Sequence, residues 1–265
     1  MISTAGSRST DMVTLMNDSA LGLILKEQDY KDNSVILTVL SEQYGKISLL
    51  AQGARKMTSK NRGSILPYTK GEFFFDYKEN RTMFRMKSAR TVNLYRRLHE
   101  NLNASLAVPV LAEVINAALL EDADPQLSRY CYQLFEQVCE LLDQGRRADI
   151  VLAIALSDLL ELLGIAPDVD DCVLCGSTSV AAISVREGGF LCAPCAALHS
   201  VPLREPEKLR AFRLINKASL EHTEMLEEIL GSALDECRIL VEFLRTHAGL
   251  PVKSFALFQR MAEES

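Results

Sequence analysis

Two pairs of cysteines, each spaced as Cys-x-x-Cys, constrain the fold of this chain more than any other feature. Cys172 and Cys175 form the first pair, and Cys192 and Cys195 form the second pair after a gap of 16 residues. Each pair can direct two thiolates at one point, and four soft ligands suit a structural zinc ion. The gap lies within the range that four-cysteine zinc sites use. The sequence therefore predicts one zinc site.

The segment between the two pairs predicts a hairpin that brings them together. Val180 to Val185 is typical of a short strand, and the glycines at 188 and 189 indicate a turn. Two disulfides, a pair of redox dithiols and an iron–sulfur cluster remain alternatives to zinc. His199 is close enough to Cys195 to replace one ligand, although four cysteines are already available. Because four thiolates leave no open position, we expect a role in folding rather than in catalysis.

The charge of the chain is divided unevenly along its 265 residues. The formal net charge is −6, yet residues 1–97 hold 16 Lys and Arg against 9 Asp and Glu, a net of +7. Residues 98–265 hold 13 Lys and Arg against 26 Asp and Glu, a net of −13. This asymmetry predicts a basic binding module joined to an acidic body, the alternative being a chance distribution over solvated faces.

The cysteine count and the hydropathy indicate the compartment. Seven cysteines, an odd number, without a secretory signal favour a reducing environment. Residues 1–18 are interpreted as a flexible leader, and the longest apolar run, Ile150 to Leu156, is too short to span a bilayer. We therefore expect a cytoplasmic, nucleoid-associated protein with no membrane partner. The other three cysteines, Cys131, Cys139 and Cys237, are expected in the core.

The hydrophobic patterning predicts an α+β multidomain chain. Five short strands within residues 19–92 indicate a small barrel of the OB-fold type, which commonly binds nucleic acids. The expected strands are residues 21–25, 34–40, 46–51, 71–77 and 82–87. Residues 93–265 have the helical period, and the zinc module, residues 168–204, is inserted among these helices. The expected helices are residues 103–120, 125–142, 147–163, 205–217, 222–229 and 232–247, with a short tail at 252–261. In the first of these, Asn103 is the expected N-cap, and Pro109 either kinks the helix or marks its start.

A basic loop from Gly53 to Gly63 is the candidate nucleic-acid contact. Its four cations stand among small and polar residues, and no carboxylate occurs from Gln43 to Gly71. Such a loop can neutralise phosphates without reading sequence, whereas the alternative is a solvated linker. The candidate DNA-binding residues are Lys46, Arg55, Lys56, Lys60, Arg62, Arg85 and Lys87. Tyr44, Tyr68 and Tyr77 are candidate platforms for stacked bases, although a place in the core or at the barrel rim is the preferred interpretation.

Enzymatic functions find little support in the motifs. Gly45 to Ser48 lacks the upstream glycine and the following helix of a phosphate-binding P-loop. A zinc deaminase requires His-x-Glu before Pro-Cys-x-x-Cys, but His222-Thr223-Glu224 follows the cysteines here. None of the four histidines has a neighbouring motif that suggests a catalytic base. We therefore assign no catalytic residues.

Two stretches of the chain resemble the RecO family of bacterial recombination mediators, over about residues 20–260. The first stretch comprises Gly22-Leu23-Ile24-Leu25, Asp29-Tyr30, Gly45-Lys46-Ile47-Ser48, Gly53-Ala54-Arg55-Lys56 and Leu66-Pro67-Tyr68. The second comprises Leu163-Gly164-Ile165-Ala166-Pro167, Cys172 and Cys175, and Gly188-Gly189-Phe190-Leu191-Cys192 with Cys195. The order and the spacing of both stretches fit the family.

The resemblance implies an OB-fold barrel, a helical domain and an inserted zinc module that serve DNA repair and recombination. It implies binding of single- and double-stranded DNA, annealing of complementary strands, and indirect help in loading RecA onto SSB-coated strands. The implied protein partners are RecR and the C-terminal tail of SSB. By position, Lys46, Arg55, Lys56, Lys60 and Arg62 match the family's DNA-contacting surface, and the four cysteines match its zinc ligands. The leader and the acidic body depart from the pattern.

Three other functions remain as alternatives. The first is a zinc-containing RNA-binding accessory protein built on the same barrel. The second is an adaptor whose basic loop docks acidic peptides. A zinc hydrolase is the most distant, because it would need an open position on the metal.

Overall fold

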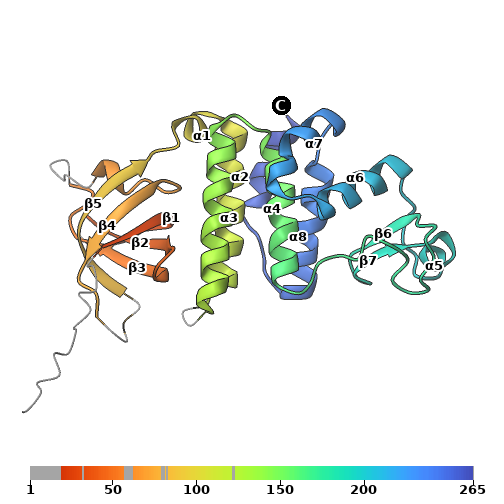
Figure 1. Ribbon diagram of the computed structural model, residues 1–265, viewed down its shortest axis with the longest axis horizontal. Helices are drawn as coiled ribbons and strands as arrows, with labels where there is room; N and C mark the ends of the chain where they lie inside the picture. The colour runs from red at the N-terminus through yellow and green to blue at the C-terminus, as the bar shows by residue number, and fades with distance from the viewer. Residues whose placement is uncertain are drawn as a thin grey trace, which may run out of the picture.

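The computed structural model describes residues 19–31, 33–56, 62–78, 81, 83–120 and 123–264. The molecule is elongated, with a strand barrel at one end, a group of helices in the middle and the small cysteine module at the other end (Figure 1). The barrel and the cysteine module are therefore separated by the full width of the helical part.

The barrel consists of five strands: β1 (Ser19–Tyr30), β2 (Ser34–Ser41), β3 (Gly45–Ala51), β4 (Lys70–Phe75) and β5 (Met83–Asn93). They close in the order β1-β2-β3-β5-β4, and only the β3–β5 pair among these neighbours is parallel. This closed five-stranded barrel confirms the predicted fold class. Alternate side chains of each strand fill its interior, which Phe73, Phe75 and Phe84 dominate.

Strand β1 is longer than the predicted residues 21–25 because residues 26–30 continue the pairing with β2. In its middle part both faces are buried. Ile24 points into the barrel, whereas Leu23 and Leu25 belong to the core of the helices. The register of the β1–β2 pair shifts between Ile24 and Lys26, and such a bulge changes the direction of the neighbouring side chains. The outer side of the barrel at β1, β2 and β3 thus lies against α3 (Pro125–Asp143), and the two parts share one apolar interface.

The helices form the middle of the molecule. After α1 (Arg96–Glu100) come α2 (Leu102–Ala118), α3, α4 (Ala148–Leu162), α6 (Pro206–Lys217), η2 (Leu220–His222), α7 (Thr223–Ile229), α8 (Leu234–Ala248) and α9 (Phe255–Glu263). Helix α4 is buried on nearly all sides because it packs against α2, α3, α6, α7 and α8. The apolar run from Ile150 to Leu156 is therefore the centre of the core. Within the described residues, no helix combines the length and the apolar character needed to cross a bilayer.

Several element boundaries differ from the prediction. Asn101, and not Asn103, caps α2, since its side chain accepts a hydrogen bond of 2.9 Å from the amide of Ala104. The helix begins seven residues before Pro109, which lies in its interior. The predicted strand from Val180 to Val185 shortens to β6 (Ala182–Ser184), which pairs with β7 (Gly189–Leu191). The first helix, α1, was not predicted.

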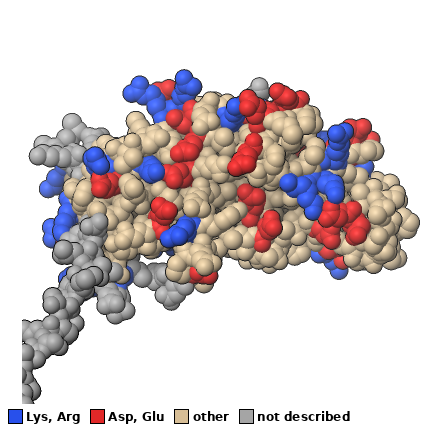
Figure 2. Space-filling model, viewed as in Figure 1, with Lys and Arg blue, Asp and Glu red and all other residues tan. Residues whose placement is uncertain are grey.

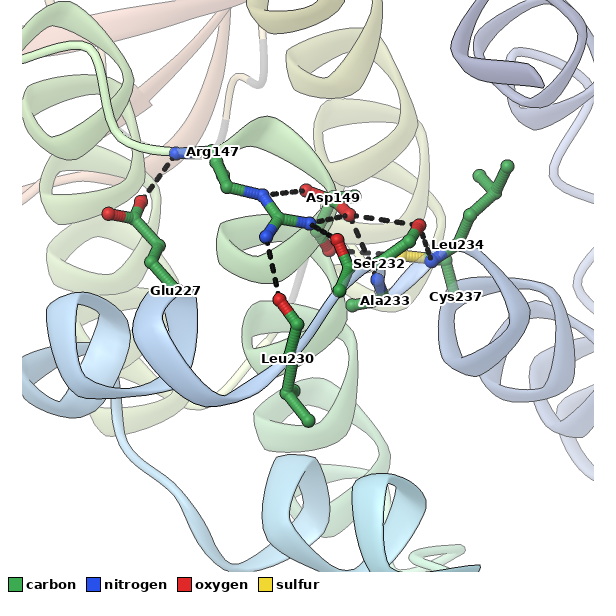
Figure 3. A network of polar contacts seen from close by, with 9 residues as sticks. Arg147, Asp149, Glu227, Leu230, Ser232, Ala233, Leu234 and Cys237 are labelled. Atoms are coloured by element: carbon green, nitrogen blue, oxygen red, sulfur yellow. Dashed lines mark hydrogen bonds and ion pairs between the residues drawn. The ribbon is translucent and has the colours of Figure 1, made fainter. Parts of the chain in front are cut away.

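A polar network around Arg147 joins the start of α4 to the segment between α7 and α8 (Figure 3). The guanidinium donates to the carbonyl oxygens of Leu230 and Gly231, both at 2.8 Å, and to both carboxylate oxygens of Asp149. Asp149 in turn accepts a 2.9 Å hydrogen bond from the amide of Ala233, at the beginning of α8. One ion pair thus satisfies backbone groups at the ends of two helices.

Candidate metal centre and nucleic-acid interface

The four predicted cysteine ligands converge on one point. Their sulfur atoms all lie within 4.8 Å of one another, and the sulfurs of Cys175 and Cys192 are 3.5 Å apart. Four metal–sulfur bonds of about 2.3 Å would set tetrahedral edges of about 3.8 Å, so the four sulfurs fit around one zinc-sized ion. All seven cysteines lie in the described part of the chain, and none of them forms a disulfide. The cluster could therefore hold a metal ion.

Two local turns aim the thiols. In the first pair, the amides of Cys175 and Gly176 donate to the carbonyl oxygen of Cys172, and Gly176 has a φ of 70° that favours glycine. In the second pair, Cys192 is the N-cap of α5 (Ala193–Leu198), and Pro194 stands in the first turn of this helix. The hairpin of β6 and β7 brings the two turns together, as the sequence predicted.

The electrostatics of the cluster favour a bound cation. Burial opposes ionisation of the Cys172 thiol, but the amides of Cys192, Leu174 and Cys175 donate to its sulfur and lower its pKa to about 6. Interaction with the neighbouring Cys192 sulfur raises the pKa of Cys195 to about 12. All four groups can ionise together only when a positive ion compensates their mutual repulsion. His199 is held by Glu187, since its Nδ1 lies 3.1 Å from the carboxylate, and it is not part of the four-sulfur cluster.

The cysteine module has a very small core of its own. It consists of Cys172, Ala182, Leu191, Cys192 and Ala196, so two of its five buried residues are metal-ligand candidates. A core of this size does not hold a fold by itself, and a metal is the usual supplement. The module therefore depends on the cluster and on its attachment to the helices.

Apolar and ionic contacts fix the module against the helical core. The ring of Phe190 packs on that of Phe212 in α6, with centroids 6.1 Å apart. Asp170 pairs with Arg213 at 2.7 Å and with Lys217 at 2.9 Å. Arg204, which follows the module's last strand and helix, pairs with Asp235 of α8 at 2.6 Å. The cluster is thus placed rigidly relative to α6 and α8.

The predicted DNA-contacting residues divide into three groups. Arg55 and Lys56 are exposed at the end of β3, where Arg55 pairs with Glu27 at 2.8 Å and with Asp29 at 2.7 Å. These carboxylates fix the guanidinium and offset part of its charge. Lys60 lies outside the described residues, as does the side chain of Arg62, whose backbone belongs to η1 (Arg62–Ser64). The described part of the basic loop thus presents one paired cation and one further exposed cation.

The second group lies on the outer face of β5. Arg85 and Lys87 point outward, whereas Phe84 and Met86 point into the barrel, which is the predicted alternation. Lys87 also pairs with Asp76 at 2.6 Å, and this pairing lowers the pKa of that carboxyl group. On the face seen in Figure 2, Lys and Arg side chains lie along the outer edge of the barrel and also near the cysteine module, while Asp and Glu side chains are spread over most of the face.

Lys46 forms the third group by itself, because the structure places it at the barrel–helix interface. Its ammonium group donates to the carbonyl oxygens of Asn116 (2.8 Å) and Leu119 at the C-terminal end of α2. A cation at this position is stabilised by the helix dipole and joins the two parts of the molecule. Lys46 therefore does not lie with Arg55 and Lys56.

The three tyrosines considered as platforms for stacked bases also lie in two separate places. Tyr68 packs against the core of the helices, with a φ of 62°. Tyr44 and Tyr77 remain together at the barrel rim, with ring centroids 5.3 Å apart. A groove beside them is also lined by Arg129 of α3. No sequence signal singled out Arg129, because only the packing of α3 on the barrel brings it there.

Family models and individual relatives of one protein family match nearly the whole chain. A family model described as Recombination protein O N terminal matches residues 16–95, and one described as Recombination protein O C terminal matches residues 99–256. A DNA repair protein RecO from Exiguobacterium sibiricum is 32% identical over 67% of this chain and 70% of its own length. Proteins of the same name from Bacillus pumilus and Bacillus subtilis are 25% and 24% identical, each over 91% of this chain and 93% of their own length.

Proposed function

The chain belongs to the RecO family of DNA repair proteins, and from that premise we propose that it is a DNA-binding recombination mediator. In this role it anneals complementary strands and helps load RecA onto single-stranded DNA coated by SSB. The observation that carries the proposal is the closed five-stranded barrel at one end of the molecule, with cations along its outer edge. No covalent bond is made or broken in annealing, so the function needs no catalytic residue.

The barrel contributes affinity without sequence specificity. Exposed Arg55, Lys56, Arg85 and Lys87, together with Lys60 and Arg62, are proposed to bind phosphates and release counterions. Phosphate contacts carry no base information, so the bases of the bound strand stay available to find complements. The carboxylates beside Arg55 compete with phosphate, and Arg55 therefore contributes less than an unpaired cation would.

The metal is proposed to be one structural Zn²⁺ held by Cys172, Cys175, Cys192 and Cys195. A bound zinc ion supplies four strong bonds that replace the missing apolar core of the module. Its proposed effect on DNA binding is indirect, because the whole helical part lies between the cluster and the barrel.

The helical half is proposed to receive the protein partners, RecR and the acidic C-terminal tail of SSB. Residues 98–265 carry a net charge of −13, which disfavours extended contact with DNA. The same charge repels an acidic tail, so the tail is proposed to dock on a local group of exposed cations and not on this half as a whole. With such partners the protein acts in the cytoplasm at the nucleoid.

Annealing of SSB-coated complementary strands tests the proposal most completely. The wild-type protein is compared with Arg55→Ala/Lys56→Ala/Lys60→Ala/Arg62→Ala on SSB-coated and on bare strands. Arg210→Ala/Arg245→Ala/Arg260→Ala removes exposed cations from α6, α8 and α9 and is the control on bare strands, because the helical half is proposed to receive the SSB tail. We expect the first variant to slow annealing at least tenfold and the control to retain the wild-type rate. Equal annealing rates for all three proteins would contradict the assignment of phosphate binding to the barrel loop. A wild-type protein that anneals no strands would contradict the proposed function.

A further inference from the structure

A groove of about 420 Å³ runs between the barrel and the beginning of α3. Its walls come from the β2–β3 turn around Tyr44, from the side of the β4–β5 connection that includes Tyr77 and Arg81, and from the first turns of α3 around Ser128 and Arg129. The chain approaches α3 closely here, since a Cβ atom built on Gly45 would lie 3.0 Å from the Ser128 hydroxyl. The groove is thus bounded by two parts of the molecule that are fixed against each other.

One wall of the groove is a supported aromatic surface. The ring of Tyr77 stacks on that of Phe84, with centroids 5.3 Å apart and an angle of 21° between the planes. Tyr44 contacts Tyr77 at 5.3 Å and the buried Phe75 at 5.7 Å. Phe75 and Phe84 belong to the barrel core, so the two half-buried tyrosines have little freedom to turn. A planar ligand can stack on such a surface with little loss of side-chain entropy.

The charged residues of the groove favour an anionic ligand. Arg81 and Arg129 are exposed, and among the described residues neither of them forms an ion pair with a carboxylate. Glu42 is the carboxylate among the described lining residues. Two arginines beside an aromatic wall combine the features that bind unpaired nucleotides, namely a π-face for the base and cations for the neighbouring phosphates.

We propose that this groove binds one unpaired nucleobase of a single strand against the aromatic wall of Tyr44 and Tyr77, with the flanking phosphates on Arg81 and Arg129. The inference rests on the proposed function and locates one binding site within it. It also extends the DNA path from the barrel onto α3, although the helical half is acidic overall. A base inside a duplex keeps both faces stacked on its neighbours, so the groove distinguishes single strands from double strands.

Three single variants test the groove on the full chain. Arg129→Gln removes an exposed charge from a helix surface, and Tyr77→Leu keeps an apolar side chain but removes the aromatic face. Tyr77→Phe keeps the face and is the matched control. Each protein is titrated into an oligothymidine that carries one 2-aminopurine and into a duplex of equal length, with anisotropy and 2-aminopurine fluorescence as the readouts.

We expect Arg129→Gln and Tyr77→Leu to weaken single-strand binding roughly 5-fold or more, since base stacking and phosphate contacts each contribute about that much. Duplex affinity should stay within about twofold of the wild type, and Tyr77→Phe should behave as the wild type does. Equal losses on both substrates, or no loss with Arg129→Gln, would overturn the inference while leaving the proposed function in place. A wild-type protein that binds no DNA would instead overturn the proposed function itself.

Discussion

Replacing Arg147 by alanine should destabilise the helical part by about 2.5–4 kcal/mol. The side chain donates two charged hydrogen bonds, to the carbonyl oxygens of Leu230 and Gly231. Such bonds contribute about 1.5–3 kcal/mol when buried, and about 1–1.5 kcal/mol each here because the Arg147 side chain is partly exposed to solvent. Its pair with Asp149 is partly exposed, with 34% and 17% of the two side chains accessible, so it adds only about 0.5–1 kcal/mol. The backbone bond from Arg147 to Glu227 is unaffected by the change.

Urea unfolding followed by helical circular dichroism measures this loss directly, with two matched controls. Arg245→Ala removes an arginine from an exposed i,i+3 pair with Glu242, whose side chains are 65% and 41% accessible, and should cost less than about 0.5 kcal/mol. Arg147→Lys keeps the charge but not the fork that reaches both carbonyls and the carboxylate, so it should recover less than half of the loss. If Arg147→Ala and Arg245→Ala proved equally stable, the structural role of the network would be refuted.

The remaining predictions concern the metal, one glycine and one carboxyl group. Chelation or Cys172→Ser should remove one bound metal ion per chain and the hydrogen-exchange protection of residues 168–204, while the barrel keeps its protection; equal loss in the barrel would contradict this. Gly189→Ala should destabilise the module by about 2 kcal/mol, since the new Cβ would lie 2.3 Å from the carbonyl oxygen of Asp168, whereas Gly231→Ala meets no atom within 4 Å and should be neutral. Burial and then Glu161 raise the pKa of Asp158 to about 6, so this carboxyl group holds its proton more tightly in the folded than in the unfolded chain. Its contribution to stability therefore falls as the pH rises from about 4 to 6, and Asp158→Asn should add roughly 1 kcal/mol at pH 7.5 and nothing near pH 4; a benefit equal at both pH values would argue against it.

The metal cluster could be predicted from the sequence because its geometry is local. Each Cys-x-x-Cys turn fixes two sulfurs by hydrogen bonds within five residues, and one short hairpin brings the two turns together. The first three barrel strands were predictable for a similar reason, since β1, β2 and β3 are joined by short turns and β2 and β3 alternate inward and outward side chains. These features depend on neighbours in the chain, whereas closure through the β1–β4 and β3–β5 pairs joins distant segments.

The parts that the sequence could not predict depend on contacts between distant residues. Lys46 reads as part of a basic surface, but its partners are carbonyl oxygens about 70 residues away at the end of α2. Arg129 stands in an acidic, helical stretch and reaches the barrel only because α3 packs against β1, β2 and β3. Leu23 and Leu25 share one face of strand β1, and this face packs into the core of the helices and not into the barrel. Tertiary packing decided each of these positions.

Cations on the barrel are proposed to bind the phosphates of a single strand. The salt dependence of single-strand affinity tests it most directly, in the wild type and in Arg55→Ala/Lys56→Ala/Arg85→Ala. Each lost phosphate contact should reduce the slope of log affinity against log salt by about 0.7, so we expect a reduction of about 1–2 after allowing for the carboxylates beside Arg55. Parallel lines for the two proteins would show that these side chains release no counterions and would contradict the claim.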